Sequence, residues 1–302
     1  AMKLGYRPNS IARAMVSGKS RIIGLVVAYL ENQFYPEALE KLSAMLQDRG
    51  YHVLIFMANT ATDNLDEILG EILDYQVDGI VAASVALSSQ LLGRCQNAGV
   101  PVVLFNRSQD LQSLSSVTSD NLQGGRKVAE FLLASAPNRI GYIAGWEGAS
   151  TQRDREFGFR QRLAEAGRDI DLRMIGNFHM DSARQATLEM FDRKAPPDAI
   201  FVANDHMAFA VMDTLRFELG VSVPHDVSVV GYDDVPTAAW PAYDLTTVRQ
   251  PVNQMVTRTV ETLLRQIDDP GSTPSRVALD GPLIIRRSVR LPEGWTDETL
   301  CE

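Results

Sequence analysis

Apolar positions in the first third of the chain alternate between short continuous runs and helical stripes. The run Ile-Ile-Gly-Leu-Val-Val at 22–27 is rich in β-branched residues and predicts a buried strand. Pro36 then suits the first turn of a helix, on which Leu39, Leu42 and Leu46 fall on one face. The alternation continues with predicted strands at 51–56, 79–82 and 101–105 and predicted helices at 65–75 and 89–98.

The same alternation resumes after a turn-like break at Ala136-Pro137-Asn138. A helix is predicted before the break at 121–134, and further helices at 153–166 and 208–219, with strands at 140–144, 200–203 and 227–231. Repeated strand–helix units predict an α/β fold with parallel sheets covered by helices on both faces. They could close into one barrel or form two open sheets. Because the elements cluster on either side of the break, we expect two open sheets.

Composition places the chain among soluble globular proteins. Of its 302 residues, 45% are hydrophobic and 22% are charged, so a hydrophobic core can form without disulfides or a structural metal. The two cysteines, Cys95 and Cys301, lie far apart, which argues against a disulfide framework and favours a reducing compartment. No secretory signal and no membrane span is recognisable, so we expect a cytoplasmic protein without a membrane partner.

Charge is distributed unevenly along the chain. The formal net charge is −9, which argues against strong nucleic-acid binding by the body of the protein. The first 21 residues, however, contain five basic residues and no acidic one. A basic arm on an acidic body predicts an attachment region for an anionic partner.

Known catalytic motifs are not recognisable. The four histidines are scattered without metal-ligand spacing, and neither a nucleophile elbow nor a phosphate loop occurs. The Gly124-Gly125 pair does not open a phosphate loop either. We therefore expect no catalytic residues, no metal and no cofactor.

Polar and aromatic residues instead follow the predicted strands. Ligands of open parallel sheets bind outside the carboxyl ends of the strands, so these are the candidate binding residues. They combine aromatics, amides, carboxylates and arginines, which suits a small polyhydroxylated ligand. The set is Tyr29, Asn32, Phe34, Tyr35, Asn106, Arg107, Asp120, Arg153, Arg155, Asn204, Asp205, Asp233 and Asp234.

Five segments in order resemble the LacI/GalR family of bacterial transcription regulators. They are L-G-Y-R-P-N-S-I-A-R at 4–13, the strand at 22–27 with N-Q-F-Y at 32–35, V-A-N-D-H-M-A at 202–208, V-S-V-V-G-Y-D-D-V-P at 227–236, and T-T-V-R-Q-P at 246–251. The resemblance runs from Leu4 to about Arg287. Each motif is modest alone, but five in the right order are highly specific.

The resemblance implies two parallel-sheet subdomains of periplasmic-binding-protein type I architecture with a ligand cleft between them. Residues 1–19 would be the end of a DNA-binding headpiece and a hinge helix. The N-terminal subdomain would comprise 20–133 and 252–277, and the C-terminal subdomain 137–250 and 279–302. The helix at 252–267 would cross back to the first subdomain.

By the same resemblance, the intact protein is expected to carry a helix-turn-helix headpiece before residue 1 and to bind operator DNA as a homodimer. In the hinge, Asn9, Ala12 and Met15 would contact DNA, with Ala12 and Met15 at the minor-groove wedge. The alternative for this segment is a frayed terminus. Effector binding would favour one closure of the subdomains and so change operator affinity, most simply as a repressor.

Ligand-binding residues are also implied by the resemblance. Arg155 matches the family's ligand-clamping arginine, Asp233 its ligand carboxylate and Asn204 a ligand-facing amide. The alternatives are an exposed helix arginine for Arg155 and a turn aspartate for Asp233 or its neighbour Asp234. Asp205 is expected to cap the helix that follows it.

Four further positions complete the predicted site. Asp120 could cap a helix or contact the ligand. Phe34 and Tyr35 lie where the family places aromatics on the ligand, although a core role is the alternative for one of them. Phe178 and Gln250 match a stacking aromatic and a crossover residue near the pocket.

Together these residues favour a sugar or sugar acid as the effector, with a purine as a less favoured ligand. The alternative function is a periplasmic-type sugar-binding protein without DNA function, which shares the architecture. The basic Y-R-P-N segment at 6–9 favours the regulator, since a secreted binding protein needs no hinge.

Overall fold

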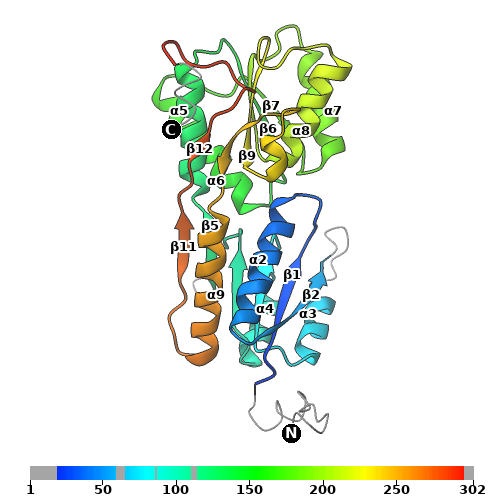
Figure 1. Ribbon diagram of the computed structural model, residues 1–302, viewed down its shortest axis with the longest axis vertical. Coiled ribbons are helices and arrows are strands. Elements are labelled where there is room, and N and C mark those ends of the chain that lie inside the picture. Colours follow the sequence, from blue (N-terminus) through cyan, green and yellow to red (C-terminus); the bar gives the residue numbers. More distant parts are fainter. Residues whose placement is uncertain (1–18, 59–64, 86, 110–113, 296–302) are drawn as a thin grey trace, which may run out of the picture. The chain divides into compact units, whose positions relative to one another are not determined.

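The computed structural model describes residues 19–58, 65–85, 87–109 and 114–295 (Figure 1). It divides into two compact units. The first takes in the described residues up to Leu30, then Tyr35–Val117 and Val252–Val277, and the second takes in Glu31–Phe34, Thr118–Pro251 and the described residues from Ala278 onward. The predicted hinge residues Asn9, Ala12 and Met15 lie outside the described residues, as does Cys301.

The first sheet has six strands in the order β11-β5-β4-β3-β1-β2. These are β1 (Ile22–Val27), β2 (His52–Met57), β3 (Gly79–Ala83), β4 (Val102–Phe105), β5 (Ser115–Ser119) and β11 (Arg276–Leu279). The pairings from β2 through β1, β3 and β4 to β5 are all parallel. Parallel strands need helical crossovers that cover both faces, which explains the continuous apolar sequences of β1, β3 and β4.

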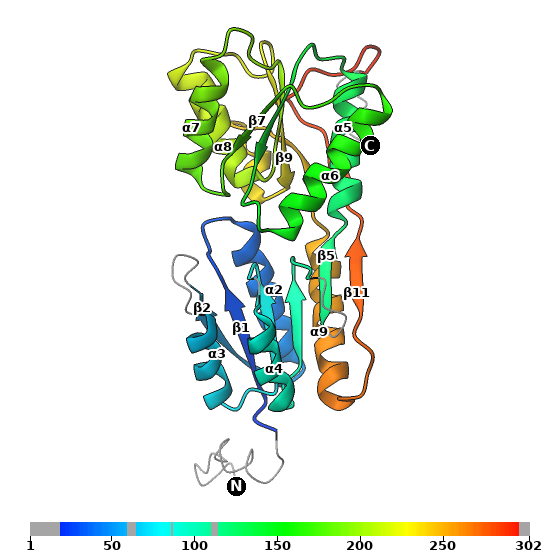
Figure 2. The same ribbon diagram turned by 180° about the vertical axis from the view of Figure 1, so that it is seen from behind.

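Alternate residues of the first sheet face different helices. Ile80 and Ala82 of β3 belong to the apolar cluster that contains Ile72 of α3 (Leu65–Asp74) and Leu91 of α4 (Ser89–Asn97). A side chain at Gly79 would instead meet Leu263 of α9 (Val252–Asp268). Figure 1 shows α9 together with α2 (Phe34–Asp48) on the near face, and Figure 2 shows α3 and α4 on the other face.

The second sheet has the order β12-β10-β9-β8-β6-β7. Its strands are β6 (Ile140–Ala144), β7 (Leu172–Ile175), β8 (Ala199–Val202), β9 (Ser228–Asp233), β10 (Thr246–Arg249) and β12 (Leu283–Ile284). The pairings are parallel except that β12 runs antiparallel to β10. The prediction of an α/β fold with two open parallel sheets is confirmed.

Helices cover both faces of the second sheet as well. They are α5 (Asn121–Ala134), α6 (Ser150–Glu165), α7 (Met180–Phe191) and α8 (Asp205–Asp213), and α8 continues into a π-helical turn at Thr214–Glu218. On one face, Tyr142 and Phe201 of the sheet pack their rings against Phe159 of α6. On the other face, a side chain at Gly141 would meet Met190 of α7. A small aromatic cluster therefore packs α6 onto the sheet.

The division between the units differs from the predicted one. Predicted helix 121–134 is observed as α5, but it belongs to the second unit, whose longest segment begins at Thr118 and not at residue 137. The reason is its packing on α6: side chains at Gly125 and Gly158 would overlap the carbonyl oxygens of Arg155 and Leu122. Two glycines thus let the helix backbones touch directly, a contact that hydrophobic periodicity does not reveal.

Several observed elements were not predicted from the sequence, among them β5, β7, β10 and α7. The strand β5 consists of Ser-Ser-Val-Thr-Ser, whose polar residues do not suggest a buried strand, yet four of its five residues are buried. Within the described part of the chain, no helix is long and apolar enough to cross a membrane.

Candidate ligand-binding site

Arg155 is the central cation of the second unit. It lies on α6 with its side chain only 3% exposed, so the alternative of a surface arginine is wrong. Its Nε donates to Asn121 Oδ1 at 2.8 Å, and its Nη1 donates to the carbonyl oxygen of Ala203. The guanidinium lies over the ring of Tyr232, 3.6 Å from the ring centroid. Three separate contacts therefore hold its orientation.

Asp233 ends β9 and faces this cation. One carboxylate oxygen accepts from Gln250 Nε2 at 2.7 Å and from Arg155 Nη2 at 3.5 Å, and the other accepts from Asn32 Nδ2 at 2.9 Å. Burial raises the pKa of Asp233, while the guanidinium of Arg155 opposes that rise. The predicted residues Arg155, Asp233 and Gln250 are thus brought together, and Asn32 joins them from the start of the second unit.

Asp205 is a second, fully buried carboxyl in the same region. Its Oδ1 accepts from Thr247 Oγ1 at 2.6 Å and its Oδ2 accepts from the backbone N–H of Val235 at 3.1 Å. Burial, with the nearby charge of Asp233 as a further cause, raises the pKa of Asp205 to about 8. Asp233 and Asp234 have positive φ angles of 130° and 56°, so Asp205 fastens a strained turn.

The helix-capping prediction was assigned to the wrong residue. Asn204, and not Asp205, is the N-cap of α8, and its side-chain oxygen accepts from the N–H of Met207 at 3.0 Å. Asp205 instead turns inward to Thr247. For Asp120, which could cap a helix or contact the ligand, the structure shows the cap: its Oδ1 accepts from the backbone N–H of Gln123 at the start of α5.

Asp234 differs in kind from Asp233. It forms ion pairs of 2.6 Å with Arg249 and with Arg286, and its side chain is only 5% exposed. Its oxygens are therefore committed to the protein itself. Asp233 faces amide donors and one arginine at longer range, so only Asp233 is placed to exchange a partner for a ligand.

Two buried polar atoms beside this cluster have no hydrogen-bond partner among the described residues. They are Gln250 Oε1 and His206 Nε2. Burial lowers the pKa of His206, which favours the neutral ring, and its closest carboxylate, Glu31, is 3.8 Å away. Buried polar atoms without partners are costly, so such atoms gathered at one sheet edge point to a ligand that would satisfy them.

Aromatic side chains lie near the same ends of the strands. Phe178 is 7% exposed, and its ring fills the space where a side chain at Gly145, directly after β6, would lie. Phe34 is buried at the first residue of α2, and its N–H donates to Asn32 Oδ1 at 3.0 Å. The backbone of Phe34 thus orients the amide that binds Asp233.

The first unit presents its own polar residues at the carboxyl ends of its strands. Tyr35 is buried, and its hydroxyl accepts from Asn106 Nδ2 at 3.3 Å. Asn106 follows β4, and its Oδ1 is buried without a hydrogen-bond partner among the described residues. Arg107 is buried beside Ser84, with its Nη2 donating to the Ser84 hydroxyl at 3.4 Å.

Several residues of the second-unit cluster were not singled out from the sequence. Asn121, His206, Tyr232 and Thr247 lie on α5, α8, β9 and β10. Three of them are direct neighbours in sequence of the predicted residues Asp120, Asp205 and Asp233, so position after a strand could have pointed to them. Thr247 offers no such signal, because it lies within β10 and its side chain reaches Asp205, at the start of α8, only in the folded chain.

The described residues contain no group of three or more His, Cys, Asp or Glu side chains that could hold a metal ion. A buried arginine, a carboxylate and amides lie together at the carboxyl edge of a parallel sheet, an arrangement that is typical of proteins that bind small polar molecules.

Comparison with known proteins specifies the class further. Residues 129–289 match the periplasmic binding protein-like domain. The HTH-type transcriptional regulator CelR of Thermobifida fusca is 30% identical over 295 residues, which covers 95% of this chain and 86% of CelR. The HTH-type transcriptional repressor PurR of Photobacterium profundum is 27% identical over 290 residues, with the same coverage of both chains.

Solved structures agree with these relatives. The structure of a CelR–cellobiose complex superposes with a TM-score of 0.82 at 30% identity, covering 95% of this chain and 88% of that one. The chain belongs to the LacI family of transcriptional regulators, and the resemblance noted in the sequence is confirmed. It is a transcription factor with a periplasmic binding protein-like domain and not an enzyme.

Proposed function

We propose that this protein is a ligand-responsive repressor whose effector is a small polar molecule of the sugar or sugar-acid class. The observation that supports this most directly is the buried pair of Arg155 and Asp233, with amide groups around it and unpaired polar atoms beside it. The first unit would contribute Tyr35, and Asp120 would contact the ligand only through its second carboxylate oxygen. The remaining residues of the site would come from the second unit: Phe34, Arg155, Phe178, Asn204, Asp233 and Gln250.

Hydroxyl groups fit the hydrogen-bonding capacity of this cluster. A guanidinium has five N–H donors, and three of those of Arg155 have protein acceptors. A sugar hydroxyl can accept from a further N–H of Arg155 and donate to Asp233 or to Gln250 Oε1. The arginine and the carboxylate balance in charge, so an uncharged sugar enters without an unmatched charge, whereas a sugar acid would pair with Arg155. The relative solved with cellobiose supports the sugar class.

Operator control would follow from differential binding. If the effector binds one arrangement of the two units more tightly than another, it shifts their equilibrium by that difference in affinity. In a homodimer with DNA-binding headpieces, this shift would change how the two hinge segments present themselves to operator DNA. The alternative of a periplasmic-type binding protein has no support from the relatives, which are named transcriptional regulators and repressors.

A ligand screen with matched variants tests the proposed site. Thermal shift of this chain would be measured with cellobiose, glucose, ribose, gluconate, galacturonate and hypoxanthine, since a ligand of the folded state raises the melting temperature. A hit would be titrated by calorimetry against Arg155→Ala, Asp233→Asn and the control Arg153→Ala. Arg153 lies on the same helix but is 57% exposed.

We expect a sugar or sugar-acid hit whose affinity falls at least tenfold in Arg155→Ala and Asp233→Asn and is unchanged in Arg153→Ala. A hit that binds all four proteins equally would refute the site. Hypoxanthine as the sole hit would refute the ligand class. Fluorescence anisotropy of the full-length protein on operator DNA, with and without the hit, then tests the coupling, which fails if operator affinity does not change.

A further inference from the structure

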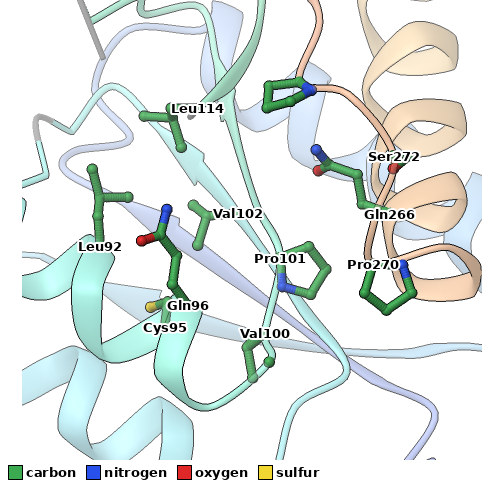
Figure 3. Close-up of a pocket in the computed structure, with 12 residues that line it drawn as sticks. Leu92, Cys95, Gln96, Val100, Pro101, Val102, Leu114, Gln266, Pro270 and Ser272 are labelled. Carbon is green, nitrogen blue, oxygen red and sulfur yellow. The ribbon is translucent and has the colours of Figure 1, made fainter. Parts of the chain in front are cut away.

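A separate cavity lies in the first unit, at the opposite end of its strands from the candidate site. Its volume is about 310 Å³, it is open to solvent on one side, and it is lined by α4, the segment leading into β4, and the turn after α9 (Figure 3). Cys95 on α4 and Pro101 and Val102 at the start of β4 form part of its wall. Gln266 and Ser272 form the opposite wall. This volume is at the lower end of the range of about 300–1,000 Å³ that is typical of small-molecule sites.

The position of this cavity separates it from the effector site. It lies at the amino end of β4, where Val100 and Pro101 precede the strand, whereas Asn106 follows the carboxyl end. Ligands of open parallel sheets normally bind at carboxyl ends. A ligand here would therefore occupy a site independent of the proposed effector.

The described residues that line the cavity carry no charged side chain. None of the residues that line it, all within the described part of the chain, is Asp, Glu, Lys, Arg or His. Leu92, Leu114 and three prolines are among the lining residues, and a charged ligand would lose hydration there without gaining a counter-charge. The lining thus selects against ions and favours an uncharged, largely apolar molecule.

Two polar atoms of the lining lack a protein partner among the described residues. Gln266 Oε1 and Ser272 Oγ are both buried, although the rest of each residue is partly exposed. The other end of the Gln266 amide donates to Ser115 Oγ at 2.9 Å. If the amide were rotated by 180°, its oxygen would accept from the Ser115 hydroxyl and its NH₂ group would have no hydrogen-bond partner. One end of this amide therefore lacks a partner in either orientation.

These two features together define a ligand chemistry. We propose that the cavity binds a small uncharged molecule that has an apolar ring and a carboxamide or hydroxyl group. The ring would lie against Leu92, Val102 and Leu114, and the polar group would satisfy Gln266 and Ser272. A carboxamide is the best match because it offers both a donor and an acceptor, as the Gln266 amide requires.

Benzamide and benzoate form a matched pair of probes, since they share a ring and a similar shape and differ in charge. We expect benzamide to bind with a Kd on the order of 1 mM, as suits a ligand of so few atoms, and benzoate at least tenfold more weakly. Binding would be measured by saturation-transfer NMR titration. Equal binding of the two probes, or no binding of benzamide up to about ten times that concentration, would overturn the proposal.

Substitutions then locate the probe. Gln266→Leu should weaken benzamide binding about fivefold by removing the hydrogen bond. The control Gln254→Leu makes the same change at an exposed position of α9 outside the cavity and should leave binding unchanged. Gln96→Trp places a large ring in the cavity from an exposed position of α4 and should abolish binding. Benzamide affinity that is the same in all three variants would place the probe elsewhere.

Cys95 provides a readout that does not depend on these variants. Cys95 is 1% exposed and lines the cavity, and burial raises the pKa of its thiol, so we expect it to react with thiol reagents only when the site opens. In a Cys301→Ser background, Cys95 is the single cysteine. Saturating benzamide should slow its modification by dithionitrobenzoate at least threefold, whereas benzoate should not. An unchanged rate with benzamide would contradict occupancy of this cavity.

Discussion

Replacing Asp205 with asparagine isolates the effect of one buried proton on stability. Asp205 is fully buried, is next to the carboxylate of Asp233, and has a pKa raised to about 8. Asp233 has the guanidinium of Arg155 and two amide donors, so the shared proton belongs on Asp205. An asparagine can imitate the protonated acid, because the Thr247 hydroxyl can accept a hydrogen bond as well as donate one.

The magnitude follows from proton linkage. The unfolded chain releases this proton near pH 3.8, whereas the folded chain keeps it up to about pH 8. Between these values the folded state binds one more proton, so stability is lost as the pH rises, by up to about 1.4 kcal/mol per pH unit. From pH 5.5 to 7.5, wild type should lose about 2–3 kcal/mol relative to Asp205→Asn, which carries no ionisable group there.

Urea unfolding followed by tryptophan fluorescence measures this difference. The three tryptophans, Trp146, Trp240 and Trp295, all lie in the second unit, so their emission reports the unit that contains Asp205. The lowered pKa of His206 acts in the opposite direction, since the unfolded state binds its proton more tightly, but it acts on both proteins and cancels in the comparison. A stability gap between wild type and variant that is equal at pH 5.5 and 7.5 would refute a protonated Asp205.

Two further predictions concern packing and ion pairs. Gly125→Ala should destabilise the second unit by about 1–3 kcal/mol, because the added Cβ overlaps a carbonyl oxygen of α6. The control Gly93→Ala on α4 meets no neighbouring atom and should be neutral or stabilising by up to about 1 kcal/mol. Thermal unfolding of the two variants measures the difference. Arg286→Ala should lower the free energy of unfolding by about 2–4 kcal/mol, since it removes one of the two ion-pair partners of the buried Asp234 side chain. The side chain of Arg287 is 80% exposed, so Arg287→Ala should change the free energy of unfolding in urea by less than about 0.5 kcal/mol. Equal effects within either pair would contradict the reasoning.

Periodicity alone was sufficient for most of the fold. The strands β1, β3, β4, β6, β8 and β9 are apolar runs buried on both faces, and such runs stand out in a sequence. The strand β5 does not stand out, because its serines are polar and are buried with hydrogen-bond partners. Ser115 Oγ accepts from Gln266 and from the N–H of Ser275, and Ser119 Oγ forms a hydrogen bond with the Tyr232 hydroxyl. Partners more than 100 residues away cannot be inferred from a local pattern.

The candidate site shows the same limit. Position after a strand was enough to select Asp233 and Arg155, since the carboxyl ends of parallel strands converge. It could not distinguish Asn204 from Asp205, two adjacent polar residues at a helix start, because either can cap a helix. What decides is that a side chain at Gly231 would overlap Asp205 Oδ1, so glycine there leaves room for the inward carboxyl.

The chain passes between the two units more than once, and this has a consequence for synthesis on the ribosome. The first unit needs α9, which begins at Val252, and the second needs the strand β12 at Leu283–Ile284. Domains of many proteins fold one after another as they emerge. Here the first unit stays incomplete until nearly all of the second has been translated. Both units must therefore complete their sheets only after the segment from Val252 to Ile284 has been translated, and until then unfinished sheets of two units coexist on one nascent chain.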